Sequence, residues 1–166
     1  TKERFTGRSE DLEGYVYSLA TSKGGLQFTR TTDEIARYAG EKYSAIGSYI
    51  RTAILTMTVQ APTRPAAPTA AGTPPVVDAV DQAIFNEEIR QFVKEKAGIV
   101  AAMKGVYSVI WSQCSETLRS RLKSNPDHEL SSANANSMEL LKAIRAQRTG
   151  FKNLRYYHHL VHPNIR

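Results

Sequence analysis

The sequence predicts an all-α protein of about six or seven helices, and three observations support this prediction. Apolar residues recur three and four positions apart in several segments, which is the period of an amphipathic helix. Alternation with a period of two does not persist, and no Asn-Gly or Asp-Gly pair is present to close a β-hairpin. The 166 residues are 41% hydrophobic, which is enough to build a core in one globular domain.

The first segment is expected to form a short helix and a turn. Ser9 is the expected N-cap of the helix, because the acidic residues that follow it complement the dipole at a helix start. Residues 21–27 are expected to form the turn, because Gly24 and Gly25 break regular structure.

Two more helices are expected before the middle of the chain. Thr31 and Glu34 have the spacing of a capping box, and Gly40 is the expected end of the helix that they begin. The next helix has one continuous apolar stripe. Its residues are Ile46, Tyr49, Ile50, Ala53, Ile54 and Met57.

The composition changes abruptly at residues 61–75, APTRPAAPTAAGTPP, which hold five of the seven prolines. Proline fixes φ and has no amide donor, so neither a helix nor a central strand continues here. We therefore divide the chain into an N-terminal helical half (1–60), a Pro-rich loop or linker (61–77) and a C-terminal helical half (78–166), which can still form one domain. A docking site for a proline-binding partner is the alternative role of the Pro-rich segment.

One long helix, or two in succession, is expected after Asp78, the N-cap. Seven of the eight positions on its stripe are apolar, and a run over 78–110 would span roughly 50 Å. Gly98 and Gly105 are possible bends in it, and Trp111 near its end is expected in the core. The stripe consists of Phe85, Ile89, Phe92, Lys96, Ile99, Met103, Val106 and Ile110.

The remaining sequence predicts three short helices. Ser115 is expected to cap the first, which ends at Asn125-Pro126, and residues 125–136 then form a polar turn. Ser137 is expected to begin the second helix, and a last amphipathic helix is expected over 151–161.

The net charge is confined to the end of the chain. Residues 1–139 carry 16 Lys or Arg and 16 Asp or Glu, whereas the last 27 residues carry six cations and no acid. Such a segment either contacts phosphates or an acidic neighbour, or forms a solvated helix face. The candidate contact residues are Lys142, Arg145, Arg148, Lys152 and Arg155.

No catalytic arrangement is found in the sequence, and we expect no enzyme, cofactor or small-molecule substrate. P-loop and dinucleotide-binding motifs are absent, and no apolar run approaches the roughly 20 residues that span a bilayer. Cys114, the single cysteine, is expected to be a buried structural thiol rather than a nucleophile. Surface or interface positions are expected, rather than a metal site, for His158, His159 and His162.

Four stretches of the sequence resemble the Gag-like polyproteins of Ty1/copia-type LTR retrotransposons. They are FTGRSEDLEGYVYSLA and QFTRTTDEIARYAGEKY in the first half, and VYSVIWSQCSETLRSRLKS and NSMELLKAIRAQRTGF in the second. The resemblance covers most of residues 5–157 and rests on helical patterns. The family normally has a zinc knuckle of the CCHC type near the Gag C-terminus, which this sequence lacks, so we expect the chain to be the capsid region of such a polyprotein.

The resemblance implies a retroviral-capsid-like bundle that self-assembles in the cytoplasm into the shell of a virus-like particle and packages retroelement RNA. Its partners would be further copies of the chain, in rings or a shell, together with RNA. Helix bundles suit this role because their side faces supply weak contacts that repeat around a closed assembly. The alternative is a helical nucleic-acid-binding module that uses the basic, aromatic C-terminal segment.

Overall fold

The computed structural model describes residues 4–19 and 24–147, and within these ranges it contains six α-helices and no β-strand. The prediction of an all-α protein is therefore confirmed. The helix expected over 151–161 lies outside the described residues. The elements are η1 (Glu10–Leu12), α1 (Gly24–Lys42), η2 (Ser44–Ile46), α2 (Gly47–Thr56), α3 (Ala79–Ser112), α4 (Glu116–Lys123), α5 (His128–Ala133) and a further helix over 137–147.

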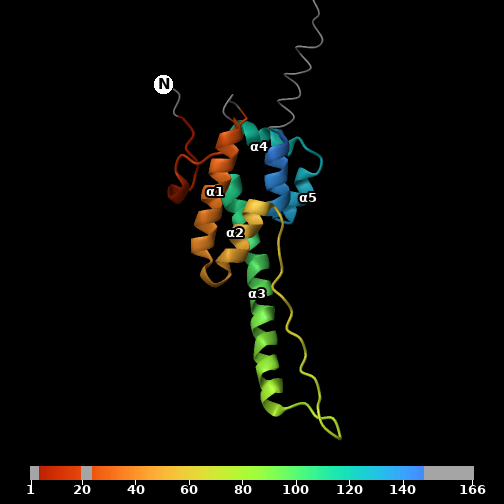
Figure 1. Ribbon diagram of the computed structural model, residues 1–166. Helices are drawn as coiled ribbons and strands as arrows, with labels where there is room; N and C mark the ends of the chain where they lie inside the picture. Colours follow the sequence, from red (N-terminus) through yellow and green to blue (C-terminus); the bar gives the residue numbers. More distant parts are fainter. Residues whose placement is uncertain (1–3, 20–23, 148–166) are drawn as a thin grey trace, which may run out of the picture.

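The described chain forms a helical head and a projecting arm (Figure 1). The head contains α1, α2, α4, α5, the 137–147 helix and the C-terminal part of α3. The arm consists of residues 58–98: an extended segment leaves α2, turns, and returns as the N-terminal part of α3. Helix α3 therefore belongs to both parts.

One hydrophobic core occupies the head and draws on both sides of the Pro-rich segment. Ile35 and Ile54, which precede this segment, are fully buried in the same cluster as Ile110 and Leu141, which follow it. The two helical halves of the sequence thus share a core.

The apolar residues predicted on the stripe of α3 are covered in two different ways, on either side of Lys96, which is exposed. Ile99 and Ile110 lie in the core of the head. Phe85, Ile89 and Phe92 lie in the arm, beyond the head, and are nevertheless half-buried. A second element must therefore cover the part of the stripe that projects from the head.

That second element is the Pro-rich segment, which runs alongside α3 (Figure 1). Burial in this segment repeats every third residue: Pro62 is buried, Pro65 and Pro68 are half-buried, and the residues between them are exposed. A period of three is that of a polyproline II helix. Pro65 lines a shared hollow with Phe92 of α3. The segment from Pro62 to Pro68 spans about 19 Å at 3.1 Å per residue, which matches about 12 residues of α3.

The caps predicted for two helices are confirmed. The Asp78 carboxylate accepts hydrogen bonds from the backbone N–H groups of Val80 (2.9 Å) and Asp81 (3.2 Å) at the start of α3. The Ser115 hydroxyl accepts one from the N–H of Leu118 (3.3 Å) at the start of α4. Helix α3 runs without a break from Ala79 to Ser112.

The predicted start of the second helix is wrong. Helix α1 already begins at Gly24, so Gly24 and Gly25 are helical rather than part of a turn. Thr31 does not cap, because it lies inside the helix and its hydroxyl donates to the backbone oxygen of Val16 (2.9 Å). Glu34 instead pairs with Arg37. Tertiary packing overrides the weak helix propensity of glycine here.

Two predictions for the second half of the chain are also corrected. The stretch 125–136, predicted to be a turn, contains the short helix α5. The next helix begins at Ser137, as predicted, and its N-cap is Asn136, whose side-chain oxygen accepts from the N–H of Glu139 (3.2 Å). Ser137 donates its hydroxyl to the backbone oxygen of Met103. Trp111 is half-buried and packs against the core rather than within it.

Gly40 was expected to end a helix, but the structure gives it a different role. Helix α1 continues past it to Lys42, and Gly40 contacts Gly47 at the start of α2. Gly47 has ordinary helical dihedrals (φ −56°, ψ −36°), so its backbone does not require glycine. A Cβ at Gly47 would overlap the carbonyl oxygen of Gly40. The absence of a side chain is what allows α1 and α2 to approach.

We predict that Gly47→Ala lowers the free energy of unfolding by about 3 kcal/mol, because backbone must move to relieve the overlap. Gly98→Ala is the matched control: its Cβ would lie 3.3 Å from Cδ1 of Ile46, the flexible end of a side chain. The control should change the free energy by less than about 1 kcal/mol. Urea denaturation followed by circular dichroism measures both values. Equal losses for the two variants would contradict the role given to Gly47.

Candidate functional site

The structure describes two of the five candidate basic residues. Lys142 and Arg145 lie exposed on the 137–147 helix, and the Nζ of Lys142 is 3.3 Å from a carboxylate oxygen of Glu139. Arg148, Lys152 and Arg155 lie outside the described residues. The acid-free end of the sequence thus begins on the exposed face of a helix whose other face is buried in the head.

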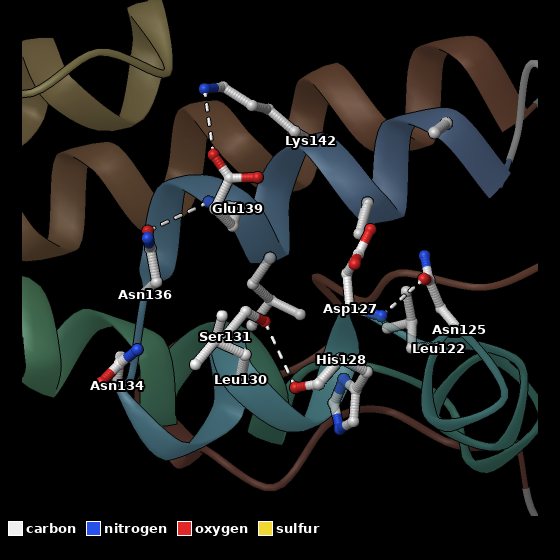
Figure 2. Close-up of a pocket in the computed structure, with 13 residues that line it drawn as sticks. Leu122, Asn125, Asp127, His128, Leu130, Ser131, Asn134, Asn136, Glu139 and Lys142 are labelled. Atoms are coloured by element: carbon white, nitrogen blue, oxygen red, sulfur yellow. Dashed lines mark hydrogen bonds and ion pairs between the residues drawn. The ribbon is translucent and has the colours of Figure 1, made fainter.

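A pocket of about 500 Å³ lies beside this helix, between it and α5 (Figure 2). Leucine and alanine side chains from α4, α5 and the 137–147 helix form the apolar part of its lining. The other residues that line it are polar or charged. In Figure 2, Leu130, Ser131 and Asn134 lie on one side and Glu139 and Lys142 on the other. The lining residues are Leu122, Asn125, Asp127, His128, Leu130, Ser131, Asn134, Asn136, Glu139, Leu140, Lys142, Ala143 and Ala146.

Several polar groups of the pocket hold the backbone of its own walls. The side-chain oxygen of Asn125 accepts from the N–H of Asp127 (3.0 Å), and that of Asn136 accepts from Glu139. The Ser131 hydroxyl donates to the backbone oxygen of His128 (3.4 Å). None of these three contacts pairs a nucleophile with a base.

A basic and aromatic cluster lies next to the pocket. The ring of Trp111 stacks on His128, with centroids 5.3 Å apart. Cationic groups of Arg119 and Lys123 lie 5.5 and 5.9 Å from the Trp111 ring centroid. This cluster is not predicted from the sequence, because His128 lies in a stretch predicted to be a turn.

Arg119 closes the C-terminal end of α3. It is 8% exposed and donates to the backbone oxygens of Trp111 (3.1 and 2.9 Å) and Ser112 (3.2 Å). Burial lowers its pKa from the ordinary value. Helix carbonyls carry partial negative charge at this end, so Arg119 has a structural role here.

Cys114 is buried, as predicted for a structural thiol. Its Sγ donates to the backbone oxygen of Ile110 (3.3 Å), and burial raises its pKa to about 12. The thiol is therefore protonated at neutral pH and is a poor nucleophile.

The tip of the arm, residues 71–84, is apolar and acidic. The backbones of Ala71 and Val76 exchange two hydrogen bonds of 3.0 Å that close the turn. Val76, Val80 and Ile84 are 64%, 65% and 52% exposed. Between Arg64 and Arg90 the chain has four acids and no Lys or Arg. They are Asp78, Asp81, Glu87 and Glu88.

Family models, curated proteins and solved structures were compared with the chain, and none of them matches it. The function is therefore argued from the residues and their geometry.

Metal-binding clusters and membrane-spanning helices are both absent from the described parts of the chain. Residues 4–19 and 24–147 contain no group of three or more His, Cys, Asp or Glu side chains placed to hold a metal ion. His158, His159 and His162 lie outside these ranges. Among the described helices, none is both long and apolar enough to cross a bilayer.

We predict that the free energy of unfolding falls as the pH rises from about 8.5 toward 12. An unfolded cysteine loses its proton near pH 8.5, whereas the pKa of buried Cys114 is about 12, so over this range the unfolded chain binds fewer protons and is favoured. Burial also raises the pKa of Tyr17, which adds to the loss above pH about 10. Cys114→Ala should flatten the profile between pH about 8.5 and 10. Urea midpoints measured across pH test this, and parallel profiles for the two proteins would contradict it.

Proposed function

We propose that this chain is a structural protein of the Gag/capsid type, which self-assembles into the shell of a virus-like particle around retroelement RNA. The observation that carries the proposal is the apolar tip of the arm. Val76, Val80 and Ile84 are more than half exposed at the end of an element that projects from the head. The resemblance of the sequence to Ty1/copia-type Gag polyproteins indicates which assembly to expect, the shell of a virus-like particle.

An arm with an apolar tip is suited to contact another macromolecule. Apolar side chains grouped at an exposed position mark a contact with another macromolecule, because leaving them in water has a cost in free energy. The arm is made by the packing of prolines on α3, so its shape is set before any partner binds. A pre-shaped projecting contact that repeats from copy to copy builds rings or shells from weak single contacts.

The described parts of the head support a structural role. Cys114 is buried with a raised pKa, Arg119 is occupied by helix carbonyls, and the pocket beside α5 holds no nucleophile–base pair. We therefore propose that the chain acts through its surfaces and catalyses no reaction.

The prediction is that the purified chain forms species larger than the monomer, in amounts that rise with protein concentration. The triple variant Val76→Ser, Val80→Ser, Ile84→Ser should reduce them at least tenfold at the same concentration, because it removes the apolar contact. Sedimentation velocity measures the species, and negative-stain electron microscopy shows whether they are rings, tubes or shells.

Leu26→Ser is the control for this experiment, since Leu26 is 74% exposed but lies on α1, in the head. It should assemble like the wild type. A wild-type chain that stays monomeric at every concentration and salt would contradict self-assembly.

The second candidate is a nucleic-acid-binding module, and the charge distribution favours it. Six cations and no acid follow Glu139, and Trp111 lies among Arg119, Lys123 and His128 nearby. A monomer that binds oligonucleotides with an affinity that falls steeply with salt would support this candidate over the capsid proposal.

A further inference from the structure

We propose that the tip of the arm of one copy docks into the pocket between α5 and the 137–147 helix of a second copy. This inference rests on the proposed self-assembly and names the two surfaces that meet. The contact is heterologous, because two different surfaces of the same chain are joined.

The two surfaces match in their apolar groups. The tip presents Val76, Val80 and Ile84. Leu122, Leu140, Ala143 and Ala146 contribute apolar atoms to the pocket, and Leu130 at its edge is 70% exposed. A volume of about 500 Å³ lies within the range of sites that enclose small apolar groups.

The two surfaces also match in charge. Residues 65–89, which contain the tip, carry four acids and no base, whereas residues 140–166 carry six cations and no acid. Lys142 and Arg145 place the first two of these cations on the helix that forms one wall of the pocket. Opposite potentials on two surfaces speed their encounter and fix their relative orientation.

The acids of the pocket restrict how the tip enters. Asp127 and Glu139 line it too, and the ion pair between Glu139 and Lys142 offsets one of the two cations of this wall. Asp81 of the tip and Glu88, further along α3, are therefore expected to face the exposed side of the 137–147 helix that carries Lys142 and Arg145, while the valines and Ile84 enter the pocket.

The tip cannot reach the pocket of its own chain. Helix α3 is unbroken from Ala79 to Ser112 and enters the core at Ile99. The 20 residues from Ala79 to Ile99 extend about 30 Å at 1.5 Å per residue, and Figure 1 shows them pointing away from α5. A second copy must supply the pocket, and a contact of this kind closes into rings or continues as a lattice.

A charge-swap experiment on the full chain tests the proposal. The arm variant is Asp81→Lys with Glu88→Lys, and the head variant is Lys142→Glu with Arg145→Glu. Each variant alone places like charges at the facing positions, 81 and 88 on the arm and 142 and 145 on the pocket wall. In an equimolar mixture, opposite charges face each other at these positions. We expect each variant alone to lose the larger species in sedimentation velocity, and the mixture to regain them.

The control variant, Arg51→Glu with Lys104→Glu, changes the net charge by the same amount as the head variant at two exposed positions outside both surfaces. It should assemble like the wild type. A head variant that still assembles would overturn the docking site but leave self-assembly standing. A monomeric wild type would overturn both. In a further outcome, the head variant loses oligonucleotide binding while the arm variant assembles normally. This result would show that Lys142 and Arg145 contact RNA and would overturn the docking site.

A cross-linking measurement covers the case in which a charge variant fails to fold. Chains with Val80→Cys and chains with Ala146→Cys are mixed and oxidised, with the native Cys114 buried in both. A disulfide-linked heterodimer is expected. Val100→Cys replaces Val80→Cys in the control, because Val100 is 55% exposed but lies outside the arm. A heterodimer yield no higher than in this control would overturn the proposal.

Discussion

The apolar residues that recur along α3 from Phe85 to Ile110 have to be shielded from water, and the rest of the architecture follows from how this is done. Near the C-terminal end of α3 the helical head covers Ile99, Met103, Val106 and Ile110. Beyond the head there are no further helices in the described chain to cover Phe85, Ile89 and Phe92. The Pro-rich segment runs alongside them instead, and its Pro65 lines one hollow with Phe92. A polyproline segment suits this task because it has no internal hydrogen bonds to lose and little conformational entropy left to pay. One helix thereby gives the molecule both a core and an arm.

Buried polar groups close the head at the C-terminal end of α3. The side chain of Gln113 is fully buried, and its amide donates to the backbone oxygens of Leu12 and Tyr15, while its oxygen accepts from the N–H groups of Arg8 and Ser9. These contacts attach the N-terminal segment to the junction of α3 and α4. Arg119 satisfies the last carbonyls of α3 at the same junction. Since a buried polar group without a partner is costly, this network fixes the N-terminal segment in one position.

The sequence predicted what depends on local spacing: α2, the whole of α3 and the caps at Asp78 and Ser115. It missed what depends on distant residues. Gly24 and Gly25 are poor helix formers, and α1 extends through them because Phe28 packs on Tyr17 (5.5 Å between ring centroids) and Thr31 bonds to Val16. The prolines were correctly predicted to end helical structure, but their packing on α3 needs both partners to be seen together. The pocket was not predicted, because α5, which forms one of its walls, is short and polar. Two of the five candidate cations, Lys142 and Arg145, lie on the helix that forms the other wall.

The proposed assembly depends on a lone chain already carrying a folded arm, so that copies meet through a shape that exists beforehand. Residue-resolved amide hydrogen exchange on the dilute chain measures this most directly, because it reports the free energy of local opening along α3. The account predicts slowed exchange over residues 85–98, weaker than over 99–110 but well below the rate of an unstructured chain. Exchange over 85–98 at unstructured rates, with 99–110 still protected, would contradict it.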